Sequence, residues 1–458
     1  MAPPGAAAGA GLQRLELPWR DPWPVARALA AERGREGLVL LEGDGSPLGR
    51  RCVLGVEPLE QVCARGLPGD ADAADPFALL AGMVDSGGGW LGWLSYEAGA
   101  WVEPGDHWQR SPMASLWAAR HDPLLHFDRQ RRLLWLEGCD RRRLAAMAAR
   151  LEALPADPVA AAASFRDPAD DPLLGAAVPL EAWHWHTPPD RFAAQVRQLL
   201  ERIAAGDLFQ ANLTACCEAL LPAAPDPLAL YGRLRRQCPA PFAGLAIAGG
   251  DARAEAVISA SPERFLQLGS DGRIETRPIK GTRPRDADPI ADADAAAALV
   301  CDPKDRAENV MIVDLLRNDL GRVCRPGSIA VPQLVGLESY AQVHHLTSVV
   351  TGELAAGRGL VDLLRACWPG GSITGAPKLR ACRRLAGLEP VSRGPYCGSL
   401  FHLAADGSFD SSILIRTLVL RDRCLRVHAG CGIVADSDPE GEAEEMGWKI
   451  GPLLRALA

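Results

Sequence analysis

The stretch AVISASPERFLQLGSDGRIETRPIKGTRPR, residues 256–285, decides the fold class of this 458-residue chain. It holds three short runs rich in apolar and β-branched residues, separated by turn sequences at Ser261-Pro262 and Gly269–Gly272. The three runs are Ala256–Ser259, Arg264–Leu268 and Arg273–Ile279. Runs of this length between turns predict neighbouring β-strands. Because no helix separates them, they favour a mixed α/β or α+β fold over a strict strand–helix alternation.

Helices are expected on both sides of this stretch. Asp302-Pro303 is typical of a helix N-cap and first turn, and the helix that it begins is expected to end before Gly321. Asp438-Pro439 repeats that signature for the last helix of the chain. Upstream, Asp190 is the expected cap of a helix that ends near Gly206.

The chain divides into three parts by local composition. Residues 12–154 mix strand-like runs with turn clusters and end in a helical stretch rich in Arg and Ala. Residues 155–182 hold five prolines and no sustained period, so we interpret them as a linker. Residues 183–458 carry the clearest helix and strand signals and form the expected main domain.

Composition excludes several classes of protein. An apolar fraction of 48% excludes a wholly disordered chain. A formal net charge of −8 argues against a general nucleic-acid or anionic-membrane binder. No apolar stretch approaches the roughly 18 residues of a transmembrane helix, and the first residues lack the pattern of a signal peptide. Thirteen scattered cysteines with no C-x-x-C pair indicate reduced thiols in the cytoplasm.

Lysine is scarce, since only Lys280, Lys304, Lys378 and Lys449 are found among the 49 Lys and Arg residues. Arg cannot lose its proton in a protein whereas Lys can, so each lysine is a candidate for chemistry closed to Arg. Lys280 lies in the segment 277–285, which holds four cations and no acid. One interpretation is a solvated basic turn. The other is that the flanking cations favour the neutral amine of Lys280 and make it a nucleophile. No pattern explains Lys304.

The last predicted helix carries Glu442, Glu445 and Lys449 on one face, because their spacing is i, i+3 and i+7. One interpretation is a solvated face with a Glu–Lys pair. The other is a magnesium site, in which carboxylates hold the ion and leave positions for a substrate oxygen. Glu308, in the first turns of the helix after Asp302, is a further candidate carboxylate.

Two glycine-rich loops resemble cofactor motifs without matching them. Gly430–Ala435 fits G-x-G-x-x-A, yet no helix opens directly after it and too little chain follows for a dinucleotide-binding unit. Residues 370–378 lack the G-K-[ST] of a phosphate loop. The sequence has no nucleophile elbow, no H-E-x-x-H and no G-x-C-x-G glutaminase elbow. Both glycine-rich loops can still present backbone N–H groups to a carboxylate.

Nine ordered blocks in residues 184–458 resemble the chorismate-utilising enzymes, a family with anthranilate, aminodeoxychorismate, isochorismate and salicylate synthases. The N-terminal part matches more loosely, best at GGWLGWLSYEAG, residues 88–99. The nine blocks are GDLFQANLT (206–214), ISASPERFL (258–266), RPIKGTRPR (277–285), DRAENVMIVDLLRNDLGRV (305–323), VHHLTS (343–348), PGGSITGAPK (369–378), YCGSL (396–400), SSILIRTLVL (411–420) and HAGCGIVADSDP (428–439). The resemblance implies a large two-sheet β-sandwich with helices packed outside. Residues 183–458 would be its chorismate-binding catalytic domain, with the N-terminal region packed into it.

Position 280 separates the branches of this family. Anthranilate, isochorismate and salicylate synthases have Ala where this chain has Lys280, whereas aminodeoxychorismate synthases read P-I-K-G-T, as residues 278–282 do here. Ala307-Glu308-Asn309 points the same way. The resemblance therefore implies an enzyme of the aminodeoxychorismate synthase component I branch, a transferase of the transaminase class. It would convert chorismate and ammonia to 4-amino-4-deoxychorismate for 4-aminobenzoate and folate biosynthesis.

Two alternatives and one partner follow from the same resemblance. An anthranilate synthase component I that carries Lys at position 280 is the nearest alternative, and a non-catalytic chorismate or tryptophan binder is the other. Because the sequence has no glutaminase motif, the ammonia is expected from a separate glutamine amidotransferase subunit.

The resemblance also assigns roles residue by residue. Lys280 is the implied nucleophile, and Glu263 is the implied general acid and base. Glu308, Glu442 and Glu445 are the implied Mg²⁺ ligands. The implied substrate-binding residues are Gly281, Thr282, His345, Thr374, Tyr396, Arg416, Gly430, Gly432 and Lys449.

Part of the family binds tryptophan in its N-terminal region. Regulatory anthranilate synthases use a Leu-Leu-Glu-Ser motif, whereas this chain has Gly43 in place of the Ser, which argues against tryptophan feedback. Some component I proteins hold a structural tryptophan between that region and a Pro-Phe segment, here Pro241-Phe242.

Overall fold

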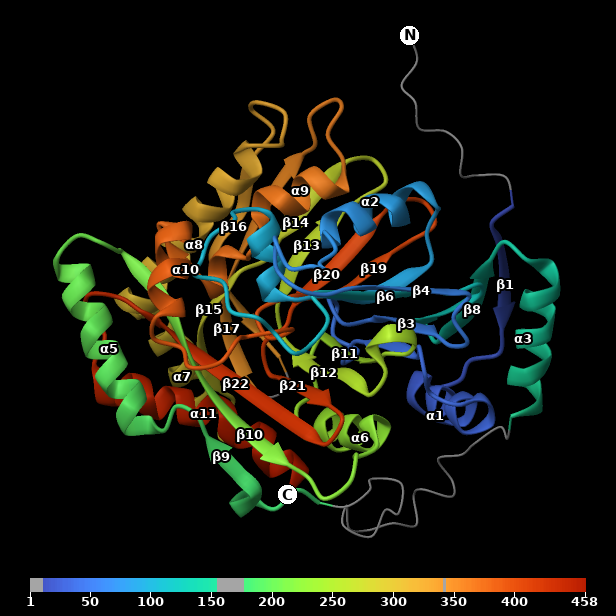
Figure 1. Ribbon diagram of the computed structural model, residues 1–458, viewed down its shortest axis with the longest axis horizontal. Coiled ribbons are helices and arrows are strands. Elements are labelled where there is room, and N and C mark those ends of the chain that lie inside the picture. Colours follow the sequence, from blue (N-terminus) through green and yellow to red (C-terminus); the bar gives the residue numbers. More distant parts are fainter. Residues whose placement is uncertain (1–10, 155–176, 341–342) are drawn as a thin grey trace.

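Two stacked β-sheets with helices on their outer faces make up this protein (Figure 1). The computed structural model describes residues 11–154, 177–340 and 343–458, and most of the predicted linker at 155–182 lies outside them. The strand pairs are antiparallel. No helix in the described ranges is both long and apolar enough to cross a membrane. The predicted two-sheet sandwich with outer helices is confirmed.

Within the described residues, the larger sheet has twelve strands and the smaller has ten. The larger sheet, sheet A, has the order β1 (Gln13–Leu17), β8 (Leu133–Gly138), β7 (Leu124–Asp128), β3 (Arg51–Gly55), β2 (Val39–Glu42), β11 (Phe242–Ile247), β12 (Glu255–Ser261), β21 (Thr417–Arg421), β22 (Cys424–Ile433), β10 (Gln210–Leu220) and β18 (Gly375–Ala376), with β9 (Trp183–Trp185) also on β10. The smaller, sheet B, has the order β15 (Ile279–Pro284), β17 (Val343–Glu353), β14 (Arg273–Thr276), β13 (Arg264–Leu268), β20 (Phe409–Ile413), β19 (Ser399–Leu403), β5 (Trp90–Leu94), β6 (Leu116–Arg120) and β4 (Glu60–Ala64), with β16 (Ala330–Ser339) also on β17.

The helices cover the outer faces of both sheets. The α-helices are α1 (Pro22–Arg33), α2 (Pro76–Asp85), α3 (Arg141–Ala153), α5 (Pro189–Ala204), α6 (Pro227–Gln237), α7 (Pro289–Cys301), α8 (Pro303–Gly321), α9 (Leu360–Cys367), α10 (Lys378–Ala386) and α11 (Pro439–Leu457). The described residues also form four short 3₁₀ helices, η1 (Tyr96–Trp101), η4 (Leu180–Ala182), η5 (Gly250–Ala252) and η6 (Gly371–Ile373).

Alternating side chains on the strands divide the apolar residues among three layers of core. In β12, Ile258 packs on the helical side of sheet A, whereas Val257 packs between the two sheets. The layer between the sheets also holds Trp93 and Trp117 of sheet B, whose ring centroids are 4.9 Å apart. The third layer lies between sheet B and helices that include α2 and α9. Each fully buried aliphatic side chain stabilises such a layer by about 1.5–3 kcal/mol.

The chain crosses from sheet A to sheet B at Pro262-Glu263, directly after β12. β12 pairs with β11 and β21 in sheet A, whereas β13 pairs with β14 and β20 in sheet B. The prediction that the first two runs of the 256–285 stretch are neighbouring strands is therefore wrong, while the pairing of β13 with β14 around Gly269–Gly272 is confirmed. Both runs are almost wholly buried, so their hydrophobic pattern does not identify their partners. The crossing places Glu263 between the sheets.

Two of the three predicted helix caps are confirmed. The Asp302 carboxylate accepts hydrogen bonds from the first N–H groups of α8, and Asp438 accepts one from Gly441 N in α11. The predicted cap at Asp190 is wrong, because α5 begins at Pro189 and Asp190 lies within its first turn. Proline is favourable at the first helical position, because a backbone N–H there makes no hydrogen bond within the helix and its absence therefore costs none.

In each sheet, the strands from residues 12–154 form one block beside the strands from residues 183–458. β2 pairs with β11 in sheet A, and β5 pairs with β19 in sheet B. The two parts of the chain therefore build the same sandwich and share its core. All thirteen cysteines lie in the described residues and are free thiols.

Candidate active site

A β-bulge in β15 positions Lys280 and Thr282. The register with β17 shifts between these two residues, and Gly281 between them has a φ of +79°. A Cβ at this position would lie 2.8 Å from Asp305 Cγ, so only glycine fits both the space and the backbone. The bulge brings Thr282 Oγ1 to 2.8 Å from His345 Nδ1. Burial, followed by the charge of Arg416, lowers the pKa of His345 to about 3, so this imidazole is neutral.

Lys280 faces a carboxylate and the backbone of β22. Its Nζ lies 3.8 Å from Glu308 Oε2 of α8. A Cβ at Gly432 would lie 3.0 Å from that same oxygen and 3.3 Å from Lys280 Nζ. Gly432 therefore forms one wall of the site, and any side chain there would press on both groups.

The arginines around Lys280 are each paired with a carboxylate of their own. The pairs are Arg277–Glu338 at 2.5 Å, Arg283–Asp302 at 3.0 Å and Arg285–Asp292 at 2.7 Å. The charge that faces Lys280 is thus the Glu308 carboxylate rather than a neighbouring cation. Residues 279–284 form the strand β15, so the interpretation as a solvated basic turn is wrong. The expected effect of the flanking cations on the Lys280 amine stays a prediction.

Glu263 is a buried carboxyl group with a raised pKa. It follows the sheet crossing, and Ser372 Oγ of η6 donates a hydrogen bond to its Oε1 at 2.7 Å. Burial raises the pKa of Glu263 to about 7, against the opposing effects of the Ser372 hydrogen bond and the charge of Lys280. A carboxyl group with this pKa can both give and take a proton near neutral pH.

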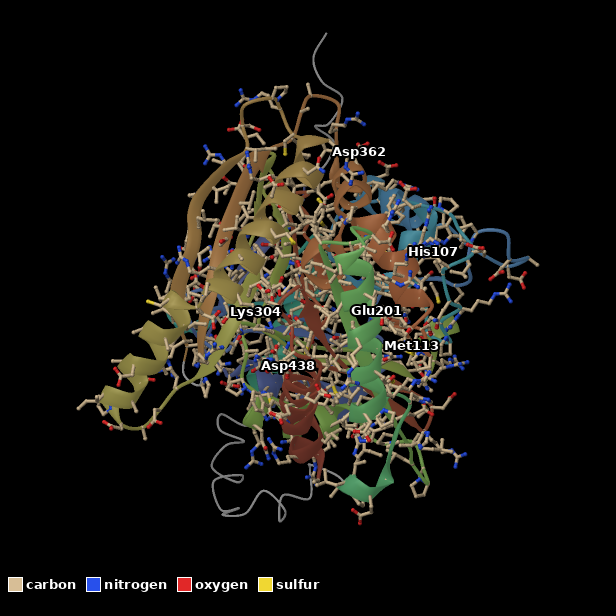
Figure 2. The ribbon with its side chains drawn as sticks, turned by 90° about the vertical axis from the view of Figure 1, so that its left-hand side faces the viewer. His107, Met113, Glu201, Lys304, Asp362 and Asp438 are labelled. Atoms are coloured by element: carbon tan, nitrogen blue, oxygen red, sulfur yellow. The ribbon has the colours of Figure 1, made fainter. Side chains whose placement is uncertain are left out.

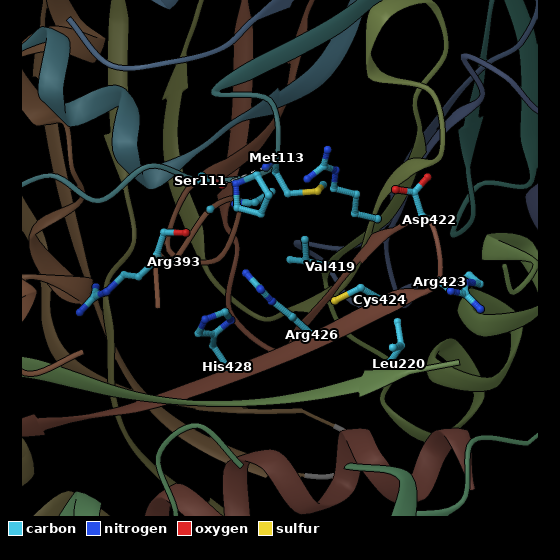
Figure 3. Close-up of a pocket in the computed structure, with 15 residues that line it drawn as sticks. Ser111, Met113, Leu220, Arg393, Val419, Asp422, Arg423, Cys424, Arg426 and His428 are labelled. Atoms are coloured by element: carbon cyan, nitrogen blue, oxygen red, sulfur yellow. Dashed lines mark hydrogen bonds between the residues drawn. The ribbon is translucent and has the colours of Figure 1, made fainter. Parts of the chain in front are cut away.

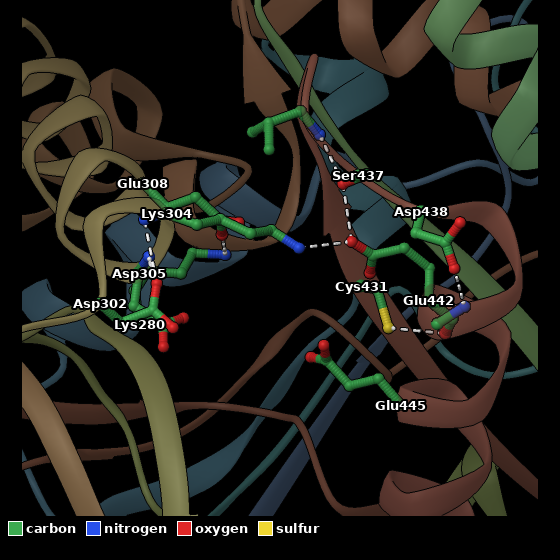
Figure 4. Close-up of polar contacts among 12 residues, drawn as sticks. Lys280, Asp302, Lys304, Asp305, Glu308, Cys431, Ser437, Asp438, Glu442 and Glu445 are labelled. Carbon is green, nitrogen blue, oxygen red and sulfur yellow. Dashed lines mark hydrogen bonds and ion pairs between the residues drawn. The ribbon is translucent and has the colours of Figure 1, made fainter. Parts of the chain in front are cut away.

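The three predicted metal ligands lie on helices that meet beside Lys280. Glu308 comes from α8, while Glu442 and Glu445 come from the start of α11 (Figure 4). Oxygens of Glu442 and Glu445 lie within 4.8 Å of one another and of Cys431 Sγ. Carboxylate oxygens suit Mg²⁺, whereas a thiol does not, so the carboxylates fit this ion and Cys431 is not expected to bind it.

The structure provides a role for Lys304. Its Nζ lies 2.7 Å from Glu442 Oε1, and Ser437 Oγ donates to the same oxygen at 2.6 Å. Lys304 on α8 and Asp438 at the start of α11 lie on the same side of the molecule (Figure 2). The interaction therefore joins the two helices that carry the predicted metal ligands.

Lys449 links α11 to β22. Its Nζ lies 2.7 Å from Glu445 Oε1 and donates a hydrogen bond to Gly430 O at 2.9 Å. Burial would raise the pKa of Glu445, but the Lys449 charge outweighs it, so this pKa lies below its usual value. Burial also raises the pKa of Glu308, with Lys280 opposing. Glu445 is thus the more strongly ionised of the two carboxylates.

The other three predicted substrate ligands are Thr374, Arg416 and Tyr396. Thr374 is buried, and its carbonyl accepts a hydrogen bond from Asn212 N of β10 at 2.7 Å. Arg416 is close enough to His345 to affect its pKa, and burial lowers the pKa of Arg416 itself. Tyr396 is buried and stacks on His428 with ring centroids 5.0 Å apart.

A cavity of about 320 Å³ is lined in part by His428, the ring on which Tyr396 stacks (Figure 3). Neither ring nitrogen of His428 has a hydrogen-bond partner in the described part of the chain. Burial, with Arg426 and Arg393, lowers the pKa of His428 to about 3. Arg393 also lines the cavity and donates to Ile373 O and Asn212 O, both at 2.8 Å. It thereby fixes the segments that carry Thr374.

The sequence analysis missed three residues of this site. Ser372, Ser437 and Lys304 each bond to a predicted catalytic or metal-binding carboxylate. All three lie in or beside the quoted blocks, and the scarcity of lysine is a signal for Lys304. The pairing could not be derived from the sequence, because it depends on how α8 packs against α11.

Two of the three residues predicted to bind tryptophan lie at a second cavity, of about 620 Å³, between the sheets. Pro241 and Phe242 line it, together with Leu41 and Glu42. Gly43 does not line it, and a Cβ there would lie 1.9 Å from Gly49 O, so a serine would require the backbone to move. A tryptophan site here stays a prediction.

Comparisons with known proteins agree on one family. A family model described as chorismate binding enzyme matches residues 51–455. Aminodeoxychorismate synthase component 1 of Klebsiella aerogenes is 46% identical over 277 residues, 60% of this chain and 60% of that protein. Anthranilate synthase component 1 of Streptomyces coelicolor is 37% identical over 435 residues, 88% of this chain and 81% of that protein.

Comparison with solved structures points to the same family. Anthranilate synthase component I of Streptococcus pneumoniae superposes with a TM-score of 0.72 at 27% identity, over 89% of this chain and 92% of that chain. The chain spans about 60% of the length of several aminodeoxychorismate synthases that it matches.

Proposed function

The chain belongs to the chorismate-binding enzyme family, and from this premise we propose that it aminates chorismate to 4-amino-4-deoxychorismate. One observation carries the proposal: the Lys280 amine lies 3.8 Å from the Glu308 carboxylate, and its charge acts on the buried Glu263, whose pKa is about 7. A nucleophilic amine beside an acid of that pKa suits displacement of an alcohol, which is a poor leaving group unless it is protonated.

The reaction takes two displacements. In the first, the neutral Lys280 amine forms a bond to C2 of chorismate, the ring double bonds shift, and the C4–O bond breaks. Glu263 gives its proton to the departing oxygen, which leaves as water. In the second, ammonia forms a bond to C4, the double bonds shift back, and the bond between C2 and Lys280 breaks. Glu263 takes up the proton that ammonia loses, which restores the enzyme.

The remaining residues bind and orient a dianionic substrate. Glu308, Glu442 and Glu445 would hold Mg²⁺, which supplies positive charge to a substrate carboxylate when it is bound. The N–H groups along Gly430–Gly432, together with Lys449 and Arg416, supply further donors and positive charge. Thr282 and His345 form a neutral hydrogen-bonding pair beside Lys280, suited to the substrate's hydroxyl or enol-ether oxygen.

The ammonia is proposed to come from a glutamine amidotransferase subunit. The relatives named component 1 support such a partner for this chain. The product would feed 4-aminobenzoate and folate synthesis, and the thirteen free thiols suit the cytoplasm.

The alternative is anthranilate synthase, the name carried by the Streptomyces coelicolor relative. That reaction also needs a base and a metal but not an amine at position 280. The presence of Lys280 next to Glu308 therefore favours formation of 4-amino-4-deoxychorismate, in which the enolpyruvyl group is retained, over formation of anthranilate, in which pyruvate is released.

Identification of the product tests the proposal. The protein is incubated with chorismate, ammonium chloride and Mg²⁺, and the products are separated and identified by mass spectrometry. We expect 4-amino-4-deoxychorismate with no release of pyruvate. Formation of anthranilate with an equal amount of pyruvate would replace the proposed function by the alternative.

A further inference from the structure

Every proposed metal-binding carboxylate is paired with a lysine in this structure. The pairs are Lys280–Glu308 at 3.8 Å, Lys304–Glu442 at 2.7 Å and Lys449–Glu445 at 2.7 Å. Lys280 has a role in the proposed reaction and Lys449 also binds the backbone of β22. Lys304 has neither, and its partner Glu442 is the most deeply buried of the three, with 2% of its surface exposed.

We infer that Lys304 is a positioning residue that holds Glu442 in the metal-free enzyme and competes with the divalent cation for it. The inference rests on the proposed function, which requires a metal at these carboxylates. It adds a reason for Lys304: the competition keeps the metal weakly bound until the substrate arrives.

The geometry at Glu442 supports the competition. Lys304 Nζ and Ser437 Oγ both bond to Oε1, so the ammonium and the hydroxyl use the same oxygen and fix the orientation of the carboxylate. In this orientation, a carboxylate oxygen of Glu442 lies within 4.8 Å of one of Glu445. Removal of the ammonium would leave Ser437 to hold this orientation and would free negative charge for a metal.

The charges explain why the competition is useful. Three carboxylates face three lysines, and before any ligand binds their charges balance as long as Lys280 keeps the proton that it must lose to react. A bound dication would leave an excess of two positive charges, which a dianionic substrate would cancel. Metal and substrate therefore favour each other's binding, and the coupling acts in both directions. Lys304 contributes because its charge acts on Glu308 and Glu445 as well as on Glu442.

Binding of Mn²⁺ alone tests the inference, with free Mn²⁺ measured by electron paramagnetic resonance. Lys304→Gln keeps a polar side chain and removes the charge, whereas Lys304→Arg keeps the charge. Arg306→Gln is the matched control, since Arg306 lies on the same helix and donates to Val300 O. Without chorismate, we expect Lys304→Gln to bind Mn²⁺ about tenfold more tightly than the wild type. Lys304→Arg and Arg306→Gln should bind it as the wild type does.

Chorismate supplies a second readout. It should tighten Mn²⁺ binding to the wild type and to Lys304→Arg more than to Lys304→Gln, because the last already lacks the competing charge. Equal or weaker Mn²⁺ binding by Lys304→Gln would overturn the inference, and so would tightening of the same size in Arg306→Gln.

The outcomes separate this inference from the proposed function. If Lys304→Gln binds Mn²⁺ more tightly but the wild type makes anthranilate, the result supports competition between Lys304 and the metal and contradicts the proposed product. If the wild type makes 4-amino-4-deoxychorismate while all variants bind Mn²⁺ equally, the function stands and the inference falls. Absence of Mn²⁺ binding with and without chorismate would remove the metal site and the inference together.

Discussion

Carboxyl groups in this site differ in protonation because their surroundings differ. Burial raises the pKa of Glu263 to about 7, whereas Lys449 holds the pKa of Glu445 below its usual value. A proton donor and a metal ligand need opposite states, since the first must carry its proton and the second must lose it. The sequence could locate Glu263 in a motif block and Glu445 on a helical face after the last block, but could not give their burial or their partners.

The pH dependence of the reaction follows from Glu263. Departure of the hydroxyl needs the protonated acid, so kcat/KM for chorismate should fall as the pH rises through about 7. Ser372→Ala removes a hydrogen bond that favours the charged form, so the pKa should rise and the alkaline limb should move to higher pH. Rate profiles of the wild type and Ser372→Ala check this. If kcat/KM falls at the same pH in both proteins, a group other than Glu263 must cause the fall.

Stability should also change with pH through Glu263. Its folded pKa of about 7 lies above the unfolded value, so the native state binds more protons and its stabilisation is present at low pH. That contribution is lost as the pH rises from about 4.5 through 7. Glu263→Gln cannot ionise and should therefore be more stable relative to the wild type at pH 8 than at pH 5. Thermal unfolding of both proteins at the two pH values measures this difference, and a constant difference would contradict the raised pKa.

At the scale of secondary-structure elements, the bulge in β15 is the feature that aligns the site. A regular strand would place Lys280 and Thr282 on the same face with unchanged register, whereas the bulge shifts the register between them. The positive φ of Gly281 and its closeness to Asp305 make this position specific for glycine.

Gly281→Ala should therefore lower activity more than stability. We expect a loss of stability of about 1–3 kcal/mol from the strained backbone and at least a tenfold fall in kcat/KM from displacement of Lys280. Gly327→Ala is the control, because Gly327 also has a φ of +79° but has no atom within 4 Å of the added Cβ. It should lose similar stability and keep its activity. Equal activity of the two variants would show that the bulge does not align the site.

Sequence patterns predicted the elements better than their partners. The caps at Asp302 and Asp438 and the strand at Arg264–Leu268 could be read locally, because each depends on residues close in the chain. The sheet crossing at Pro262-Glu263 could not, because a short buried run fits either sheet. Lysine scarcity singled out Lys280, and helical spacing singled out Glu442, Glu445 and Lys449, but the roles of the site residues came only from the resemblance, since distant elements bring them together.

At the scale of the whole molecule, the N-terminal region is part of the catalytic fold. β2 lies within sheet A between β3 and β11, and β5 lies within sheet B between β6 and β19. Trp93 and Trp117 of this region fill the core between the sheets. Removal of residues 12–154 would expose two strand edges and empty that core.

The fragment 183–458 should therefore not fold by itself. We expect weak near-ultraviolet circular dichroism and no cooperative thermal transition for the fragment, whereas the full chain should unfold in one transition. Co-expression of residues 12–154 as a separate chain should restore folding in part. A fragment that unfolds cooperatively and turns over chorismate would contradict a shared core.

A covalent bond between Lys280 and chorismate is the step on which the proposed reaction depends. The 458-residue protein is incubated with chorismate and Mg²⁺ without ammonia, quenched in acid and digested, and its peptides are sequenced by mass spectrometry. We expect a peptide modified at Lys280 by the mass of chorismate less one water, absent from Lys280→Ala and lost when ammonia is added before the quench. An unmodified Lys280 in a protein that forms 4-amino-4-deoxychorismate, or the same adduct in Lys280→Ala, would contradict it.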